Sequence, residues 1–322
     1  MSESQNPTDV DVSVIVVNYN TAHLLKDMRD ALKASTGQLK VETIIVDNAS
    51  RDDSVSLLKH EFSDAKLIFN DRNLGFGRAN NQGLAVATGR YILLLNTDAF
   101  VAPDTLMKTV TFMNAHEEFG ILGVRLVGRD GVLQPCCRYF PTPWNLFVNR
   151  TGLHRMFPRT RMVDDMGWDH ASVRECDWVI GCYYLIRRAV IDQVGLFDPR
   201  YFLYSEEVDH CHSSKSAGWK VVYFPDTTVV HIGGESAKSD SPLSASGQIS
   251  SLQIESELLY FRKHHGISGA MTALALSSIA DVVIAVKNAV RGRWERVNEA
   301  NKHLSLYWAS VFSTRLGSRP TR

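Results

Sequence analysis

The stretch Tyr91-Ile92-Leu93-Leu94-Leu95-Asn96-Thr97-Asp98 joins a short apolar run to a polar, acidic end. The apolar part, Tyr91–Leu95, is typical of a strand that is buried on both faces. Open α/β sheets bind their ligands beyond the carboxyl ends of the parallel strands, which is where Asp98 falls. Taken alone, Asn and Asp after a strand more often form an ordinary turn. The stretch therefore predicts a parallel sheet and makes Asp98 a candidate ligand for a hard cation.

The composition is that of a globular protein with an uneven charge. The 322 residues are 44% hydrophobic and 22% charged, with a net charge of zero, which excludes a disordered or fibrous chain. From Gly266 to Arg322, however, eight Lys and Arg oppose three acids, a net charge of +5. Such an asymmetry favours a tail that meets an anionic surface.

The termini and the cysteines favour an intracellular protein. Residues 1–10 are polar, lack an apolar signal segment and predict a flexible N-terminus. The five cysteines form no CxxC pair, so they predict neither a disulfide framework nor a zinc site. A reducing cytosol is the simplest setting for them.

Strand and helix patterns alternate along the first hundred residues. The runs at 12–17, 41–46, 66–70 and 91–95 predict strands, with helix patterns between them at 21–34, after Asp52 or Asp53, and at 78–88. This alternation predicts an α/β domain with a mainly parallel sheet and helices on both faces. Regular patterns return later, with strands near 178–186 and 221–224 and helices near 189–194, 205–217 and 251–263.

Two segments resist a single interpretation. Residues 128–175 lose periodicity and interleave seven arginines with six aromatic residues, which predicts either an acceptor-recognition surface or an ordinary irregular surface. Residues 267–286 are mostly apolar, with one acid, Asp281, and are long enough to cross a bilayer. Their richness in Ala, Ser and Gly makes insertion less favourable. Two alternatives stay open, a helix lying in a membrane interface and a helical hairpin packed on the main domain.

Short motifs of glycine, polar and acidic residues follow one another between residues 12 and 236. They are Val14-Ile15-Val16-Val17-Asn18-Tyr19-Asn20, Val46-Asp47-Asn48-Ala49-Ser50, Asn73-Leu74-Gly75-Phe76-Gly77-Arg78-Ala79-Asn80-Asn81, Leu95-Asn96-Thr97-Asp98, Phe197-Asp198, Phe202-Leu203-Tyr204-Ser205-Glu206-Glu207-Val208-Asp209 and His231-Ile232-Gly233-Gly234-Glu235-Ser236. In this order and spacing they resemble the family 2 glycosyltransferases of GT-A fold, especially the rhamnosyltransferase-like branch of bacterial surface-polysaccharide assembly. The resemblance implies a Rossmann-like GT-A catalytic domain over residues 11–265 and a C-terminal helical extension over 266–322.

The resemblance implies a donor site at the strand ends. Asp47 would accept the N3–H of a uracil or thymine base, although it could equally cap a turn. Arg78 would be available to a phosphate. The implied donor-binding residues are Asn18, Tyr19, Asn20, Asp47, Asn48, Asn73, Gly75, Arg78, Asn81 and Asn96.

The resemblance also implies a metal site. Asp98 would hold Mg²⁺ or Mn²⁺, which neutralises charge on the departing diphosphate. The commoner family triplet has two acids, or an acid after Asn-Pro, whereas Asn96 stands first here. His231 resembles the late histidine that approaches the metal or the diphosphate, although a lone histidine is more often structural.

Inverting transfer needs a base for the acceptor hydroxyl. The family supplies it from a Glu-Asp pair at a helix start, and here the pair is Glu206-Glu207. We expect Glu207 to be the base and Glu206 to contact the acceptor or orient the site. The implied acceptor residues are Trp178, Gly181 and Asp209, of which the first two could be core and Asp209 could complement the helix dipole.

Together these features imply an inverting, metal-dependent transferase. It would move L-rhamnose from dTDP-L-rhamnose to a glycan or polyprenyl-linked acceptor at the inner face of the cytoplasmic membrane, where the tail would meet anionic lipid. A UDP-sugar enzyme is the alternative, and nucleic acid is not an expected partner. A nucleotidyltransferase would carry a Gly-rich, basic first loop, which residues 18–20 lack. An inactive glycan-binding scaffold is disfavoured by the presence of Asp47, Asp98, Glu207 and His231.

Overall fold

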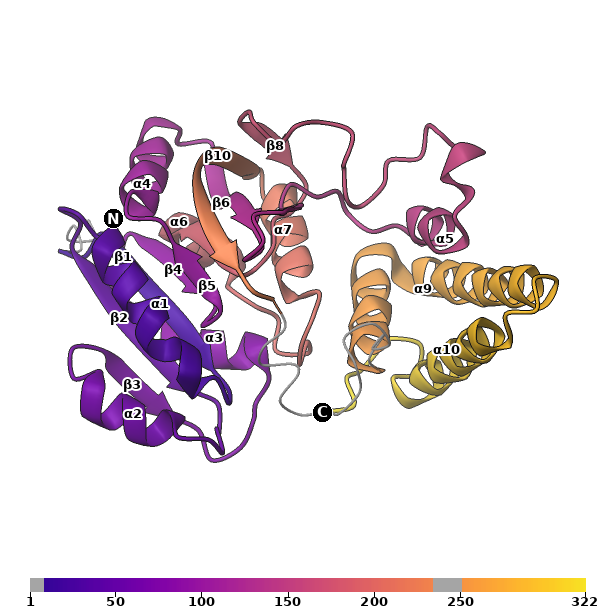
Figure 1. Cartoon of the computed structure of the whole chain (residues 1–322), viewed down its shortest axis with the longest axis horizontal. Coiled ribbons are helices and arrows are strands. Elements are labelled where there is room, and N and C mark those ends of the chain that lie inside the picture. Colours follow the sequence, from indigo (N-terminus) through magenta and orange to yellow (C-terminus); the bar gives the residue numbers. More distant parts are fainter. Residues whose placement is uncertain (1–8, 234–250) are drawn as a thin grey trace, which may run out of the picture.

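The computed structural model describes residues 9–233 and 251–322. Most of the predicted flexible N-terminus and residues 234–236 of the late histidine motif therefore lie outside the described residues. The described chain forms an α/β domain built on one large sheet, with a helical hairpin beside it (Figure 1). The predicted α/β fold class with a C-terminal helical extension is confirmed.

One half of the sheet is parallel, as the alternation of patterns predicts. Strand β1 pairs in parallel with β2 and β4, and β2 pairs in parallel with β3. Every residue of β4 is buried, because the parallel strands are covered on both faces. The bounds are β1 Val12–Asn18, β2 Val41–Asp47, β3 Lys66–Phe69 and β4 Tyr91–Leu95.

The other half of the sheet is mixed. The strand order is β3-β2-β1-β4-β9-β6-β10-β5, with β7 paired to β6 and β8 paired to β10. Strand β9 lies between β4 and β6 and pairs antiparallel with both, so it joins the two halves into one continuous sheet. The bounds are β5 Ala99–Val101, β6 Phe119–Val127, β7 Leu133–Gln134, β8 Arg174–Cys176, β9 Tyr183–Arg187 and β10 Lys220–His231.

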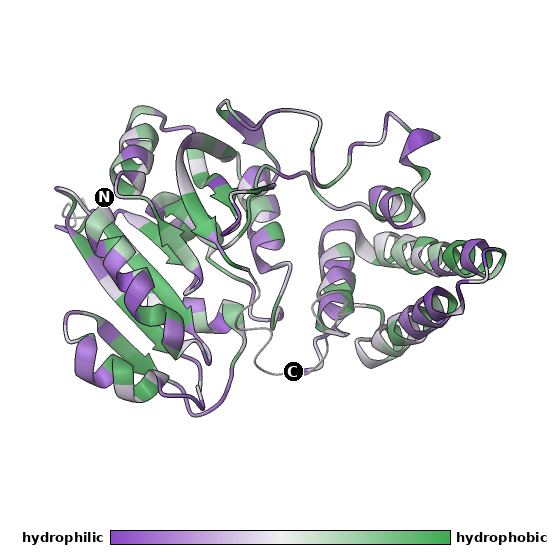
Figure 2. Ribbon diagram, in the orientation of Figure 1, coloured by the Kyte–Doolittle hydropathy of each residue, from purple (hydrophilic) through white to green (hydrophobic). Residues whose placement is uncertain are grey.

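Helices cover the sheet, and their apolar sides complete its core. In Figure 2 the strands are largely green, whereas the helices at the edge of the domain alternate between green and purple. The helices of this domain are α1 Ala22–Ser35, α2 Ser54–Glu61, α3 Phe76–Leu84, α4 Thr105–Ala115, α5 Pro143–Thr151, α6 Arg188–Val194 and α7 Glu206–Ser216, with a 3₁₀ turn η1 at Leu153–Arg155.

Two elements differ from the sequence-based expectation. Strand β10 extends past the predicted residues 221–224, because register shifts next to Lys220 and Phe224 let it continue to His231. His231 is therefore the last residue of this strand. In the segment without periodicity, α5 begins at a capping box in which the hydroxyl of Thr142 accepts from the N–H of Asn145.

The C-terminal hairpin consists of α9 (Ser251–Ala289) and α10 (Trp294–Ser313). Gly266 breaks α9 with φ 66° and ψ −162°, at the predicted boundary between residues 265 and 266. Packing crosses this kink, because Phe261 and Ala273 both belong to the core of the main domain. The division into a catalytic domain and a tail therefore stays a prediction. A second, smaller core joins the helices through Ile254, Leu258, Leu274, Tyr307 and Val311.

Candidate active site

The predicted base-binding carboxylate, Asp47, lies at the carboxyl end of strand β2. Asn18 and Asp47 end neighbouring parallel strands and stand opposite each other in register. The Asn18 amide donates to Asp47 Oδ2 at 2.7 Å, and the N–H of Ser50 donates to Asp47 Oδ1 at 3.0 Å. Asp47 is buried, and its two oxygens keep lone pairs for a further donor. Ser50 belongs to a motif that the sequence singled out, but no role was predicted for it. Its hydroxyl accepts from the Asn18 amide and from the N–H of Asn20.

Two hydrogen bonds made by the Thr21 hydroxyl join the loop after β1 to the loop that carries Asp98. The Thr21 hydroxyl donates to Asn18 Oδ1 at 2.7 Å and lies 2.9 Å from the Thr97 hydroxyl, and all three residues are buried. Asn20, with φ 54°, turns the backbone after Tyr19. Asn96 is half-buried, and its N–H donates to the carbonyl of Cys182.

Three predicted donor residues organise the loop before α3. The Asn48 side chain donates to Asn73 Oδ1 at 2.9 Å and accepts from the N–H of Leu74 at 3.0 Å. Gly75 has φ 88°, and a Cβ there would lie 2.4 Å from the carbonyl oxygen of Phe202. Only glycine permits this approach, which brings the loop against the segment that precedes α7.

Arg78 and Asn81 hold that same segment in place. Arg78 donates to the carbonyl of Pro199 at 2.8 Å and to that of Arg322 at 2.9 Å. The Asn81 amide donates to the carbonyl of Phe197 and accepts from its N–H. In this conformation both side chains are hydrogen-bonded to the backbone of other segments. Their expected part in donor binding stays a prediction.

The two predicted metal ligands meet through strand pairing. His231 stands opposite Ala99 in the antiparallel register of β10 and β5, which places its Nε2 3.6 Å from Asp98 Oδ1. Burial lowers the pKa of His231 and favours the neutral ring. The N–H of Gly233 donates to Asp98 Oδ2 at 3.1 Å and holds the buried carboxylate in place.

Gln134, which sequence reasoning missed, sets the tautomer of His231. Its carbonyl Oε1 lies 2.8 Å from Nδ1 of His231, and its amide donates to the His231 carbonyl at 2.9 Å. A carbonyl can only accept, so Nδ1 carries the proton and Nε2 turns its lone pair toward Asp98. Two facing acceptors suit a shared cation. No group of three or more His, Cys, Asp and Glu within the described ranges forms a metal cage, so a bound diphosphate would have to supply further oxygens.

Strained backbone presents the acidic pair at the start of α7. Tyr204 and Ser205 adopt φ values of 72° and 65°, which residues other than glycine rarely adopt. Burial raises the pKa of both Glu206 and Glu207. The charge of Glu207 raises the pKa of Glu206 further, whereas the charge of Arg138 opposes the rise at Glu207. Each glutamate has a buried oxygen with no partner among the described residues.

The two glutamates face opposite sides of the site. A Cβ built at Gly77 on α3 would lie 3.9 Å from Cβ of Glu206, whereas one built at Gly181 would lie 4.0 Å from Cβ of Glu207. Glu206 thus faces the donor loop. Glu207 faces the segment that was expected to meet the acceptor.

Of the three predicted acceptor residues, Gly181 lies next to Glu207. Trp178 is buried and donates its indole N–H to the carbonyl of Tyr139 at 2.9 Å. Asp209 is buried and accepts from Lys263 at 2.7 Å and from His264 at 2.6 Å. Trp178 therefore belongs to the core, and Asp209 anchors α9 to α7 because two side chains of α9 occupy its carboxylate.

Comparisons with known proteins place these features in a family context. Residues 13–162 match the model of Glycosyl transferase family 2. The chain is 27% identical over 250 residues to N-acetylglucosaminyl-diphospho-decaprenol L-rhamnosyltransferase of Mycobacterium tuberculosis, covering 72% of this chain and 79% of that protein. It is 26% identical over 232 residues to Rhamnosyltransferase WbbL of Escherichia coli, covering 68% of this chain and 83% of that protein.

Solved structures share the fold at lower identity. A mannosyltransferase from Pyrobaculum calidifontis in complex with GDP-Man and Mn²⁺ superposes with a TM-score of 0.55 at 17% identity, over 97% of this chain and 91% of that chain. TarS 1–349 of S. aureus gives a TM-score of 0.51 at 15% identity, over 96% and 92%. At these identities the likeness is one of fold alone.

Proposed function

Because this chain belongs to the family 2 glycosyltransferases and resembles rhamnosyltransferases of polysaccharide biosynthesis, we propose that it transfers L-rhamnose from dTDP-L-rhamnose, with inversion, to a glycan on a polyprenyl diphosphate. The observation that carries the proposed chemistry is the half-buried carboxylate of Glu207, whose buried Oε2 has no partner among the described residues. The relatives' names support the sugar and the lipid-linked acceptor.

The reaction would use the chain's groups as follows. An acceptor hydroxyl attacks the anomeric carbon, and the bond to the nucleotide diphosphate breaks and leaves its electron pair on the diphosphate. Glu207 takes the hydroxyl proton from the side of Gly181. Asp98 and His231 would hold Mg²⁺ or Mn²⁺, whose charge, when the ion is bound, stabilises the departing diphosphate. Gln134 keeps Nε2 of His231 free of its proton.

The donor base would be read at Asp47. A carboxylate accepts from the N3–H of thymine or uracil, whereas cytosine presents an acceptor at the same position. This contact does not separate dTDP from UDP, so a UDP-sugar is the alternative donor. GDP and ADP should compete weakly with either nucleotide.

Turnover of a panel of nucleotide sugars, followed by NMR of the product, tests the proposed function. We expect dTDP-L-rhamnose to give an α-L-rhamnoside, because inversion acts on a β-linked donor, and we expect EDTA to stop the reaction. Retained configuration would refute the inverting mechanism. Turnover of a UDP-sugar but not of dTDP-L-rhamnose would refute the donor, and full activity in EDTA would refute the metal.

The C-terminal hairpin packs on the main domain through a buried polar cluster. Helix α9 is long and apolar enough to cross a membrane by length and composition. However, its acid Asp281 is buried, paired with Arg150 of α5 and 2.8 Å from Nδ1 of His303 on α10. Arg150 also donates to the hydroxyl of Ser277 at 2.7 Å. These contacts support the packed-hairpin alternative over a membrane-spanning helix.

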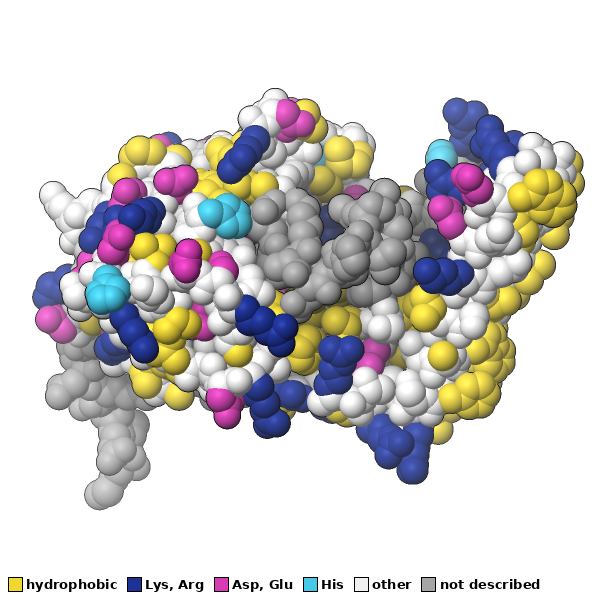
Figure 3. All heavy atoms as spheres, turned by 60° about the horizontal axis from the view of Figure 1, so that its bottom comes forward, with side chains coloured by type: hydrophobic (Ala, Val, Ile, Leu, Met, Phe, Trp, Pro, Cys, Tyr) yellow, Lys and Arg dark blue, Asp and Glu magenta, His cyan; other side chains and the backbone are white. Residues whose placement is uncertain are grey.

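The opposite face of the hairpin supports peripheral attachment at the inner face of the cytoplasmic membrane. Lys287, Arg291 and Arg293 are exposed at the end of α9 and just after it. Figure 3 shows dark blue groups above and below a yellow strip at the right-hand edge of the molecule. Apolar and basic side chains in this arrangement suit an anionic lipid surface. The exposed apolar residues recur at helical spacing and are 49–85% exposed: Ile267, Met271, Ile279, Val282, Val286 and Val290.

The double substitution Val282→Asp and Val286→Asp should release the protein from anionic liposomes in a flotation assay, because it places two charges in the apolar face. Asn298→Asp with Asn301→Asp adds the same charge at exposed positions of α10 and serves as the matched control. Equal loss of liposome binding in both variants would mean that the added negative charge, and not its place in the apolar face, causes the release. If the wild-type protein does not float with anionic liposomes, the proposed membrane attachment is ruled out.

A further inference from the structure

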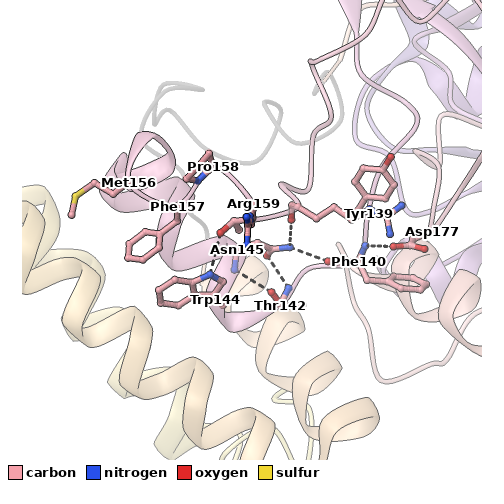
Figure 4. A pocket seen from close by; sticks show the side chains of 12 residues that line it. Tyr139, Phe140, Thr142, Trp144, Asn145, Met156, Phe157, Pro158, Arg159 and Asp177 are labelled. Carbon is pink, nitrogen blue, oxygen red and sulfur yellow. Dashed lines mark hydrogen bonds between the residues drawn. The ribbon is translucent and has the colours of Figure 1, made fainter.

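A pocket opens in the segment between β7 and β8, for which the sequence left two interpretations. It has a volume of about 740 Å³ and lies between Tyr139–Phe140, α5 and residues 156–161 (Figure 4). The proposed reaction does not use it. Its lining combines arginines with aromatic and methionine side chains.

The pocket carries positive charge that the protein does not neutralise. Residues 131–163 contain five arginines and no Asp or Glu. Two of these arginines line the pocket, Arg159 and Arg161, and neither forms an ion pair with a described residue. Arg161 stacks on the ring of Tyr139 at 3.3 Å, which fixes its guanidinium. The acid that lines the pocket, Asp177, already accepts from Lys215 at 3.0 Å. Two such guanidinium groups suit a phosphate or a diphosphate.

The wall beside these arginines is apolar and partly open. Trp144 packs edge-on against Phe157 at 4.9 Å and donates its indole N–H to the hydroxyl of Thr160 at 3.1 Å, so the ring is held in place. Trp144 is 41% exposed, Phe157 37% and Met156 71%. An anion site next to such a wall fits a ligand that has a charged head and an apolar chain.

The pocket lies between the proposed base and the hairpin. On one side, the ring of Phe140 contacts that of His212 on α7 at 4.9 Å. His212 follows Glu207 by five residues, which corresponds to about 7.5 Å along a helix. On the other side, α5 is joined to the hairpin through Arg150 and Asp281, and Figure 1 shows α5 beside α9.

We propose that this pocket binds the diphosphate and the first isoprenoid units of the acceptor lipid. Arg159 and Arg161 would bind the phosphates, and Trp144, Met156 and Phe157 would contact the chain as it leaves toward the hairpin's apolar face. The inference rests on the proposed function in one respect, that the acceptor is lipid-linked. The short path to Glu207 implies that the glycan on this lipid is short, since the sugar next to the diphosphate already lies near the base.

Direct binding of farnesyl diphosphate tests the pocket without any transfer reaction. With dTDP and Mn²⁺ present to occupy the donor site, the wild type should bind farnesyl diphosphate more tightly than farnesol or pyrophosphate. Arg159→Ala with Arg161→Ala should raise the Kd about tenfold to a hundredfold, because charge-assisted hydrogen bonds are lost. Arg129→Ala removes an exposed arginine that does not line the pocket, and this control should leave the Kd unchanged.

Two further variants separate this role from damage to the fold. Arg159→Ala alone removes a side chain that contacts no described residue through a hydrogen bond or ion pair, so its effect on Kd is not an effect on folding. Phe157→Ala should weaken binding of farnesyl diphosphate but not of pyrophosphate. An unchanged Kd in the double arginine variant, or an equal loss in Arg129→Ala, would overturn the proposal.

Turnover then separates this inference from the proposed function. Arg159→Ala should raise KM for a polyprenyl-diphosphate acceptor and leave KM for a lipid-free acceptor glycoside unchanged. Equal rises for both acceptors would contradict the pocket assignment. If the wild type binds farnesyl diphosphate in this pocket but transfers no rhamnose, the proposed donor fails while the pocket assignment stands.

Discussion

Replacing Glu207 by glutamine is expected to lower the rate of sugar transfer by about two to four orders of magnitude, since proton removal from the acceptor is lost. Binding of dTDP with Mn²⁺ should stay close to wild type, because Glu207 faces Gly181 and not the donor loop. Single-turnover kinetics, with calorimetry for the nucleotide, would measure both quantities.

The pH dependence of transfer adds a second signature. Glu207 acts as a base only when it is ionised, and burial raises its pKa above the ordinary glutamate value of 4.5. The rate should therefore rise as the pH increases through this raised pKa. The acidic limb of the rate profile should disappear in Glu207→Gln.

Glu206→Gln is the matched control, because it makes the same change one residue away on the donor side. We expect a milder loss, since the raised pKa of Glu206 already favours its protonated form, which glutamine resembles. If Glu206→Gln proves the more damaging, Glu206 is the base and the assignment of the pair is reversed.

Asp98→Asn is expected to reduce transfer at least a hundredfold, on the order seen when one stabilising group is removed from a developing negative charge. It should also remove the metal-dependent part of dTDP binding. Asparagine can still accept the hydrogen bond from Gly233, so the loss is specific to the charge and not to the loop.

Calorimetry of dTDP with and without Mn²⁺ measures the metal-dependent part. The matched control is Asp226→Asn, an exposed carboxylate on the same strand as His231, which should leave both affinities unchanged. Persistence of the full metal enhancement in Asp98→Asn would remove Asp98 from the metal site.

Local sequence patterns were sufficient for the parallel half of the fold. The apolar runs at 12–17, 41–46 and 91–95 were predicted as strands, and the structure confirms them as β1, β2 and β4. A buried strand can be predicted from a few consecutive side chains, so no long-range information is needed. The acidic pair Glu206-Glu207 was found in the same way, as adjacent residues, although its catalytic role stays a prediction.

Only the tertiary structure showed which distant residues form side-chain contacts with one another. Gln134 orients His231 across 97 residues of chain, and Arg150 reaches Asp281 across 131. The same long-range packing decided that Arg78 contacts the carbonyl of Pro199 and that Asp209 contacts Lys263. It also decided that one face of the apolar C-terminal helix is buried. Such pairings depend on which strands and helices become neighbours in the folded chain. A local sequence pattern around either partner does not specify that arrangement.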